Sequence, residues 1–192
     1  MEENRINPDS KALVIGGSAG SLQVLFSLLP LLKSNLTFPV IIVLHRRYHA
    51  DSSLSDLLGT KTFAPTHEVE DKDVIRPGHI YLAPADYHLL VEKTLTFSLD
   101  YSEKVNFSRP SIDVTFESAS EAYGPALSAL LLSGANEDGT KGLAFVKQQG
   151  GTTIVQNPDT AQMPFMPHHA LTHTQIDHVF DVQQMAEFIN NL

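Results

Sequence analysis

The stretch Ala12-Leu13-Val14-Ile15-Gly16-Gly17-Ser18-Ala19-Gly20-Ser21 joins a short apolar run to a glycine-rich turn that carries a serine. An apolar run of this length, rich in β-branched residues, is typical of a buried strand. The glycines leave room for a tight strand-to-helix turn because they carry no Cβ. Residues 16–20 also fit G-x-S-x-G, a pattern that exposes a nucleophilic serine at a strand end. Ser18 is therefore a candidate nucleophile, with a helix cap or a phosphate ligand as the simpler alternatives.

Apolar strands alternate with amphipathic helices along the rest of the chain. Strands are expected at residues 12–16, 40–44, 79–83, 88–92, 95–99, 127–132, 152–156 and 179–180. Helices are expected at residues 21–33, 52–58, 111–122, 138–149 and 182–189. The turn at residues 92–94 suggests an antiparallel hairpin. The pattern predicts an α/β fold with a doubly wound, mostly parallel sheet flanked by helices on both faces.

Length, charge and cysteine content restrict the class of protein. The chain has 192 residues, a formal charge of −9 and no cysteine. We expect residues 1–10 to be a polar lead-in and residues 11–192 to form one domain. The acidic balance disfavours nucleic acid and anionic membranes as partners. No signal-peptide core or membrane-length apolar run is present, so a soluble cytoplasmic protein is expected.

Two more polar side chains follow predicted strands. His45 comes directly after residues 40–44, and Asp138 lies in the loop after residues 127–132. Because parallel strands end at one edge of a sheet, Ser18, His45 and Asp138 are expected to converge there. A serine, a base and a carboxylate that orients the base form the nucleophilic set for acyl transfer. Taken alone, a histidine such as His45 is more often structural or substrate-contacting than catalytic. Asp138 alone is better explained as the N-cap of the helix that it precedes.

Two other kinds of site compete with this interpretation. A dinucleotide site would need G-x-G-x-x-G, but Ser18 and Ser21 occupy its second and third glycine positions. Arg46 could still suit a 2′-phosphate, so an NADP site is disfavoured rather than excluded. Histidines four residues apart at 45 and 49, and a late cluster at positions 168, 169, 173 and 178, raise the question of a metal. His45 ends a strand rather than lying on a helix, so surface histidines explain the late cluster better.

Several spaced motifs resemble one family, the CheB protein-glutamate methylesterases, over about residues 11–190. The motifs, in chain order, are Ile15-Gly16-Gly17-Ser18-Ala19-Gly20, His45, Val74-Ile75-Arg76-Pro77-Gly78-His79-Ile80-Tyr81-Leu82-Ala83-Pro84, Arg109-Pro110-Ser111-Ile112-Asp113-Val114, Leu132-Ser133-Gly134 with Asp138-Gly139, and Met166-Pro167. The resemblance implies a serine hydrolase that demethylates glutamyl methyl esters of chemoreceptors, some members also deamidating glutamines. It implies a triad of Ser18, His45 and Asp138. Because the sequence has no cysteine and no compact metal-ligand motif, we expect the reaction to need no metal and no cofactor.

The resemblance also implies partners and regulation. The substrate would be a methylated chemoreceptor or receptor-like protein, and because this chain is acidic, a local basic patch of Arg46, Arg47 and Arg109 is expected to bind it. Family members commonly carry an N-terminal receiver domain, whereas about ten residues precede the first predicted strand here. A separate receiver protein or a methyltransferase is a further expected partner.

The chain departs from the family's usual pattern around the predicted triad. Ala19-Gly20-Ser21 stands where threonine and two glycines are usual, and Leu44 where glutamine precedes the histidine. Ala135-Asn136 stands where Met-Gly is usual, and His168 where arginine follows Met-Pro. A non-catalytic module that binds a receptor or a methyltransferase, and a nucleotide-binding α/β protein, are the alternatives to an esterase.

Overall fold

The computed structural model describes residues 11–46 and 54–192 of the chain. Its centre is a seven-stranded sheet in the order β3-β4-β2-β1-β7-β8-β9, and every neighbouring pair of strands is parallel. The strands are β1 (Ala12–Gly17), β2 (Val40–Leu44), β3 (Thr66–Glu68), β4 (Ile80–Leu82), β7 (Leu127–Leu131), β8 (Thr152–Gln156) and β9 (His178–Phe180). The predicted parallel sheet is therefore confirmed. The strands β1 and β2 are apolar because helices cover both faces of the sheet there.

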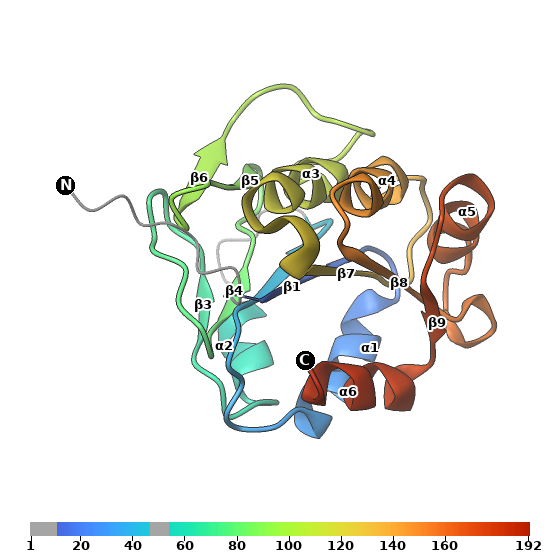
Figure 1. The fold of residues 1–192 in the computed structure, drawn as a ribbon, viewed down its shortest axis with the longest axis horizontal. Coiled ribbons are helices and arrows are strands. Elements are labelled where there is room, and N and C mark those ends of the chain that lie inside the picture. Colours follow the sequence, from blue (N-terminus) through green and yellow to red (C-terminus); the bar gives the residue numbers. More distant parts are fainter. Residues whose placement is uncertain (1–10, 47–53) are drawn as a thin grey trace.

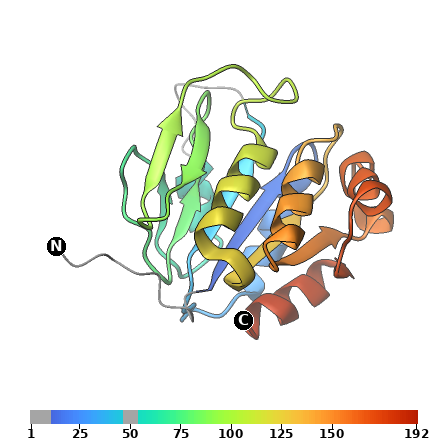
Figure 2. The same ribbon diagram turned by 45° about the horizontal axis from the view of Figure 1, so that its top comes forward.

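The predicted antiparallel hairpin is also present, outside the main sheet. It consists of β5 (His88–Val91) and β6 (Phe97–Asp100), with Leu89 opposite Leu99 and Val91 opposite Phe97. The second strand begins two residues later than the sequence predicts. Figure 2 shows the hairpin standing beside the helix α3 (Ile112–Tyr123), against which β5 packs.

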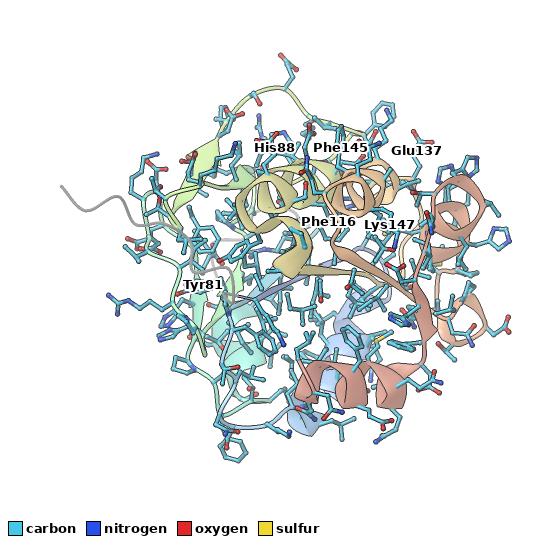
Figure 3. The ribbon with its side chains drawn as sticks, viewed as in Figure 1. Tyr81, His88, Phe116, Glu137, Phe145 and Lys147 are labelled. Atoms are coloured by element: carbon cyan, nitrogen blue, oxygen red, sulfur yellow. The ribbon has the colours of Figure 1, made fainter. Side chains whose placement is uncertain are left out.

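Helices cover both faces of the sheet (Figure 1). One face carries α3, α4 (Thr140–Gln148) and α5 (Phe165–His173), and the other carries α1 (Ser21–Leu28), α2 (Leu54–Gly59) and α6 (Val182–Asn190). Each helical layer buries apolar side chains against the sheet, which divides the core into two clusters. Phe116, fully buried on α3, lies between that helix and the sheet (Figure 3).

The predicted helices differ from the structure mainly at their ends. The first helix stops at Leu28, and Leu29–Leu31 continues it as a 3₁₀ turn containing Pro30, since proline removes a backbone donor. The fourth predicted helix begins at Thr140 rather than at residue 138, because Gly139 precedes it with φ of 92°. Part of the expected helix at residues 52–58 lies outside the described residues. Two other 3₁₀ turns occur, at Gly124–Ala126 and Pro158–Thr160.

Two elements have no counterpart in the predicted pattern. The helix α5 contains Pro167 and four polar residues, and Phe165 is half exposed, so the sequence shows no clear apolar stripe. The strand β3 has three residues at the sheet edge, and Glu68 is its last residue. The charged residues 70–73, which follow β3, lie against the hairpin, where Lys72 N donates to Phe97 O.

The order of the strands reverses around β1. From β1 the chain passes to β2 on one side and returns later to β7 on the other side. In open α/β sheets, sites form outside the carboxyl ends of strands at such a reversal. No helix among the described residues is both long and apolar enough to cross a membrane.

Candidate active site

The three predicted site residues follow three adjacent strands. Ser18 follows β1, His45 follows β2, and Asp138 lies in the loop between β7 and α4. The backbone keeps the strands in register past their ends, because His45 N donates to Gly17 O at 3.2 Å and Ser18 N donates to Ser133 O at 2.9 Å. The central sheet thus brings residues from distant parts of the sequence to one edge.

The carboxylate of Asp138 is fully buried and accepts five hydrogen bonds. Oδ1 accepts from Asn106 Nδ2 at 2.9 Å, Ser111 Oγ at 2.9 Å and Asp113 N at 3.1 Å. Oδ2 accepts from His45 Nε2 at 2.7 Å and Ile112 N at 2.7 Å. An ionised carboxylate offers acceptors for this many donors, whereas a protonated one would turn a donor toward them.

The electrostatics of Asp138 follow from these donors. Burial raises the pKa of Asp138, but the hydrogen bonds from His45, Asn106 and Ile112 outweigh burial and lower the pKa to about 2. Two of the five donors are backbone N–H groups at the start of α3, where the helix dipole also favours negative charge. Asp138 therefore remains charged at neutral pH.

The alternative reading of Asp138 as the N-cap of the following helix is wrong. Gly139 is the N-cap of α4, and no side chain caps that helix. Asp138 instead caps α3, a helix whose first residue lies 26 positions earlier in the chain. The cause is tertiary, since α3 and α4 pack against each other over the same face of the sheet.

The ring of His45 is held at both nitrogens. Its Nε2 faces Asp138, and its Nδ1 lies 3.3 Å from the hydroxyl oxygen of Ser108. Because the carboxylate can only accept, Nε2 carries the proton and Nδ1 holds the lone pair in neutral His45. The side chain of His45 is 12% exposed. Because Nε2 is bonded to Asp138, Nδ1 is the nitrogen that can act as a base.

Ser18 lies half-buried in the turn after β1. Ser21 stabilises this turn through two hydrogen bonds to the backbone oxygen of Ser18. Its backbone N–H donates at 3.1 Å and its hydroxyl at 2.5 Å. Among the described residues, no hydrogen bond joins the Ser18 hydroxyl to His45, whose Nδ1 contacts Ser108 instead. Catalytic hydrogen bonds commonly tighten only when substrate is bound. The catalytic roles of the three residues thus remain predictions.

Gly16 and Gly17 are required because neighbouring side chains leave no room for a Cβ atom at either position. A Cβ on Gly17 would lie 2.5 Å from Ser21 Cβ, and one on Gly16 would lie 2.4 Å from Ile112 Cγ2. Gly20, the residue before α1, has φ of 83°, which favours glycine. Ser21, which differs from the family's usual glycine, thus has a place in the turn rather than disrupting it. Asn136, another departure, accepts the backbone N–H of Asp138 through its side chain at 3.2 Å.

A cavity of about 310 Å³ opens beside His45. It is lined by His45, Arg46, Asp86, Lys104, Phe107, Ser108 and Arg109. Arg46 reaches it while donating to Glu68 at 2.6 Å, and the guanidinium of Arg109 stacks over the Tyr101 ring at 3.8 Å. Two of the three arginines expected to bind substrate therefore lie at the cavity. Arg47 lies outside the described residues.

Sequence reasoning missed several residues around this site. Asn106, Phe107 and Ser108 form a turn directly before the Arg-Pro-Ser motif, and Lys104 precedes them. Asp113, quoted only as part of that motif, is buried and accepts from Gly142 N at 2.7 Å and Asn106 Nδ2 at 2.8 Å. Burial and the charge of Asp138 raise the pKa of Asp113 to about 6. The sequence shows only that polar residues such as Asn106 lie beside the Arg-Pro-Ser motif. It does not show which side chains they contact.

The late histidines do not assemble a metal site in the part of the chain that the structure describes. His169 and His173 stack at 3.9 Å on α5, and His169 Nδ1 shares a hydrogen bond of 2.9 Å with Thr140 Oγ1. No group of three or more histidine, aspartate and glutamate side chains there could hold a metal ion.

A hydroxyl, an imidazole and a buried ionised carboxylate, at the carboxyl ends of parallel strands, define an α/β domain with the components of a serine hydrolase. Comparisons with known proteins narrow this class. Residues 13–189 match the family described as CheB methylesterase. The chain belongs to this family, and the predicted family is therefore confirmed.

Relatives support the same assignment across the whole chain. A "Putative protein-glutamate methylesterase/protein-glutamine glutaminase" of Leptospira interrogans is 42% identical over 95% of this chain and 94% of the relative. A protein-glutamate methylesterase/protein-glutamine glutaminase of Thermotoga maritima is 33% identical, and the match covers 92% of this chain and 52% of that protein. The crystal structure of the Thermotoga maritima CheB methylesterase catalytic domain superposes with a TM-score of 0.90 at 32% identity, covering 95% of this chain and 98% of that one.

Proposed function

We propose that this chain is a protein-glutamate methylesterase/protein-glutamine glutaminase in which Ser18 is the nucleophile, His45 the base and Asp138 the group that orients the base. The observation that carries the assignment of roles is the 2.7 Å contact between His45 Nε2 and the buried Asp138 carboxylate. This contact fixes the tautomer of His45 and leaves on Nδ1 the lone pair that can accept a proton.

The proposed reaction proceeds through an acyl-enzyme. The Ser18 oxygen attacks the carbonyl carbon of a glutamyl methyl ester, and His45 Nδ1 takes the serine proton. Backbone N–H groups of the turn after β1 stabilise the oxyanion. The tetrahedral intermediate collapses, and methoxide leaves as methanol with the proton from His45. Water then attacks the acyl-enzyme with His45 again as base, which releases the glutamate carboxylate and restores the serine.

For Nδ1 to serve Ser18, the contact between His45 and Ser108 must give way. The separation of 3.3 Å is long for a hydrogen bond to a hydroxyl. Replacing the contact of Nδ1 with Ser108 by one with Ser18 therefore costs little free energy. Ser108 also contacts Asn106 O at 3.4 Å, which gives its proton another acceptor when His45 turns to Ser18.

Substrate binding is assigned to the cationic cavity beside His45. The chain as a whole has a charge of −9, so its general field repels an acidic receptor segment. Arg46, Lys104 and Arg109 concentrate positive charge where the ester must enter, and among the described residues that line the cavity only Asp86 carries a carboxylate. We assign a methylated chemoreceptor, or a receptor-like protein, as the substrate.

The test is methanol release from a methylated chemoreceptor fragment, comparing the wild type with Ser18→Ala. The proposal expects turnover by the wild type and none by the variant. Labelling with a fluorophosphonate probe separates an esterase from a non-catalytic binding module and from a nucleotide-binding protein, because only an activated serine reacts. Receptor binding without methanol release or labelling would support the non-catalytic module instead.

A further inference from the structure

Asn106 occupies a constrained position next to the candidate triad. Val105 and Ser108 close a tight turn through backbone hydrogen bonds of 3.2 and 2.9 Å in both directions. The two central residues, Asn106 and Phe107, both have left-handed backbone conformations, with φ of 49° and 62°. Asparagine suits the first central position of such a turn. Its side chain points inward, toward the loop that carries Asp138.

The carboxamide of Asn106 bridges two buried carboxylates. Its Nδ2 donates to Asp138 Oδ1 at 2.9 Å and to Asp113 Oδ2 at 2.8 Å. Carboxylate oxygens only accept when ionised, so the amide must present its NH₂ group to them, and both amide protons are used. Among the side chains of the described residues, only that of Asn106 donates to both aspartates.

The bridge matters because the two aspartates disfavour each other's charge. Asp113 lies on the first turn of α3, with Asp138 against the same helix end, and both are buried. Like charges in one buried space raise the cost of ionising either group. The partial positive charge of the amide NH₂ lies between the two carboxylates and offsets this repulsion. It also leaves Oδ2 of Asp138 to His45 and Ile112.

We propose that Asn106 is a positioning residue of the active site, which holds the Asp138 carboxylate in the orientation that accepts a proton from His45 Nε2. The proposal rests on the proposed function, since it assigns Asn106 a role in the same reaction. The same turn places Ser108 against His45 Nδ1, so one short segment contacts both the acid and the base. Asn106 acts through the Asp138 carboxylate, and among the described residues no hydrogen bond joins its side chain to Ser18.

The competing explanation is that asparagine serves only the turn. Two variants separate these roles because both tolerate a left-handed backbone. Asn106→Gly keeps the conformation and removes both donors. Asn106→Asp keeps the size as well, but replaces the donors with a third carboxylate. Lys72→Gly is the matched control, because Lys72 is an exposed non-glycine residue with φ of 71° on a loop away from the site.

Steady-state kinetics on a methylated receptor fragment give the first readout. We expect Asn106→Gly to lower kcat by about 10- to 100-fold, as misplaced catalytic groups typically do. Asn106→Asp should lower kcat further, and KM should stay within about twofold in both. Thermal unfolding should show both variants folded, and Lys72→Gly should retain wild-type kcat. A kcat for Asn106→Gly within about twofold of wild type would overturn the proposal.

Proton NMR gives a second readout that does not depend on turnover. The hydrogen bond from His45 Nε2–H to Asp138 should give a resonance far downfield in the wild type, assigned by its loss in His45→Gln. This resonance should move upfield or broaden in Asn106→Gly and remain in Lys72→Gly. An unchanged resonance in Asn106→Gly would overturn the proposal. If the wild type releases no methanol, the proposed function fails, and the resonance still decides whether Asn106 positions Asp138.

Discussion

The carboxylate of Asp138 accepts a 2.7 Å hydrogen bond from the backbone N–H of Ile112, so the acid of the candidate triad is held at the N-terminus of α3. His45 lies 93 residues away in sequence and meets the same oxygen. The position of the acid is therefore set by a helix rather than by its own loop.

The triad should behave as one unit. Ser18→Ala or His45→Ala should each reduce methanol release by about three orders of magnitude or more, and the double variant should lose little more. Asp138→Asn should also be slow, because an amide NH₂ facing His45 would favour the wrong tautomer. The measurement is kcat on a methylated receptor fragment. Losses that simply add in the double variant would contradict the triad.

Arg109 should act on binding more than on chemistry. Arg109→Ala should raise KM for an acidic receptor fragment by about 2- to 5-fold, the effect of a partly exposed ion pair, and should change kcat less. The increase should shrink at high salt, and Arg109→Lys should restore part of it. Lys93→Ala, at an exposed lysine outside the cavity, is the control. An unchanged KM in Arg109→Ala would reject this role. Arg46 should matter less, since Glu68 already neutralises part of its charge.

Turnover should not require a metal. Activity on the receptor fragment should survive exhaustive dialysis against a chelator, since the proposed steps use only a hydroxyl, an imidazole and a carboxylate. The measurement is kcat before and after chelation, with metal content determined for the same samples. Activity that is lost on chelation and restored by zinc would contradict the prediction and make the histidines of α5 candidate metal ligands.

Asp113 should make stability depend on pH in a defined window. Its pKa is raised from 3.8 to about 6, so the folded state binds more protons than the unfolded state between about pH 4 and pH 6. The free energy of unfolding should therefore fall as pH rises through this window, by up to about 3 kcal/mol. The test is the free energy of unfolding of the wild type minus that of Asp113→Asn, measured by denaturation at several pH values from 4 to 8. A difference that stays constant with pH would show that Asp113 is not protonated in this range.

Gly16 should be sensitive to a single methyl group. In Gly16→Ala the new Cβ would meet Ile112 Cγ2 at 2.4 Å, so the Ile112 side chain, or the start of α3 that carries it, must shift. We expect a loss of about 1–3 kcal/mol in stability, as for overpacked cores. The kcat should fall as well, because Ile112 N holds Asp138. Gly59→Ala is the control, with its nearest atom at 3.7 Å. Wild-type kcat in a destabilised Gly16→Ala variant would argue against coupling between this helix end and the chemistry.

The sequence alone determined the class of fold and the edge of the sheet where chemistry is expected. Alternation of apolar strands with amphipathic helices is a local pattern, and β2 and β8 begin and end at the predicted residues. Ser18 and His45 were found because each directly follows a buried strand. Elements without a clear period, such as α5 and the three-residue β3, were missed because local pattern does not specify edge pairing or partial burial.

Only the tertiary structure decided how the site is held together. The sequence places Asp138 before a helix and so suggests a local cap, but packing of α3 beside α4 turns its carboxylate toward Ile112 and Asp113 instead. In the same way, nothing in the sequence near Asn106 shows that its amide meets two aspartates from other segments. Hydrogen bonds in strands and helices follow from local periodicity. Contacts between side chains of distant segments depend on how the layers pack, and the periodicity does not encode that packing.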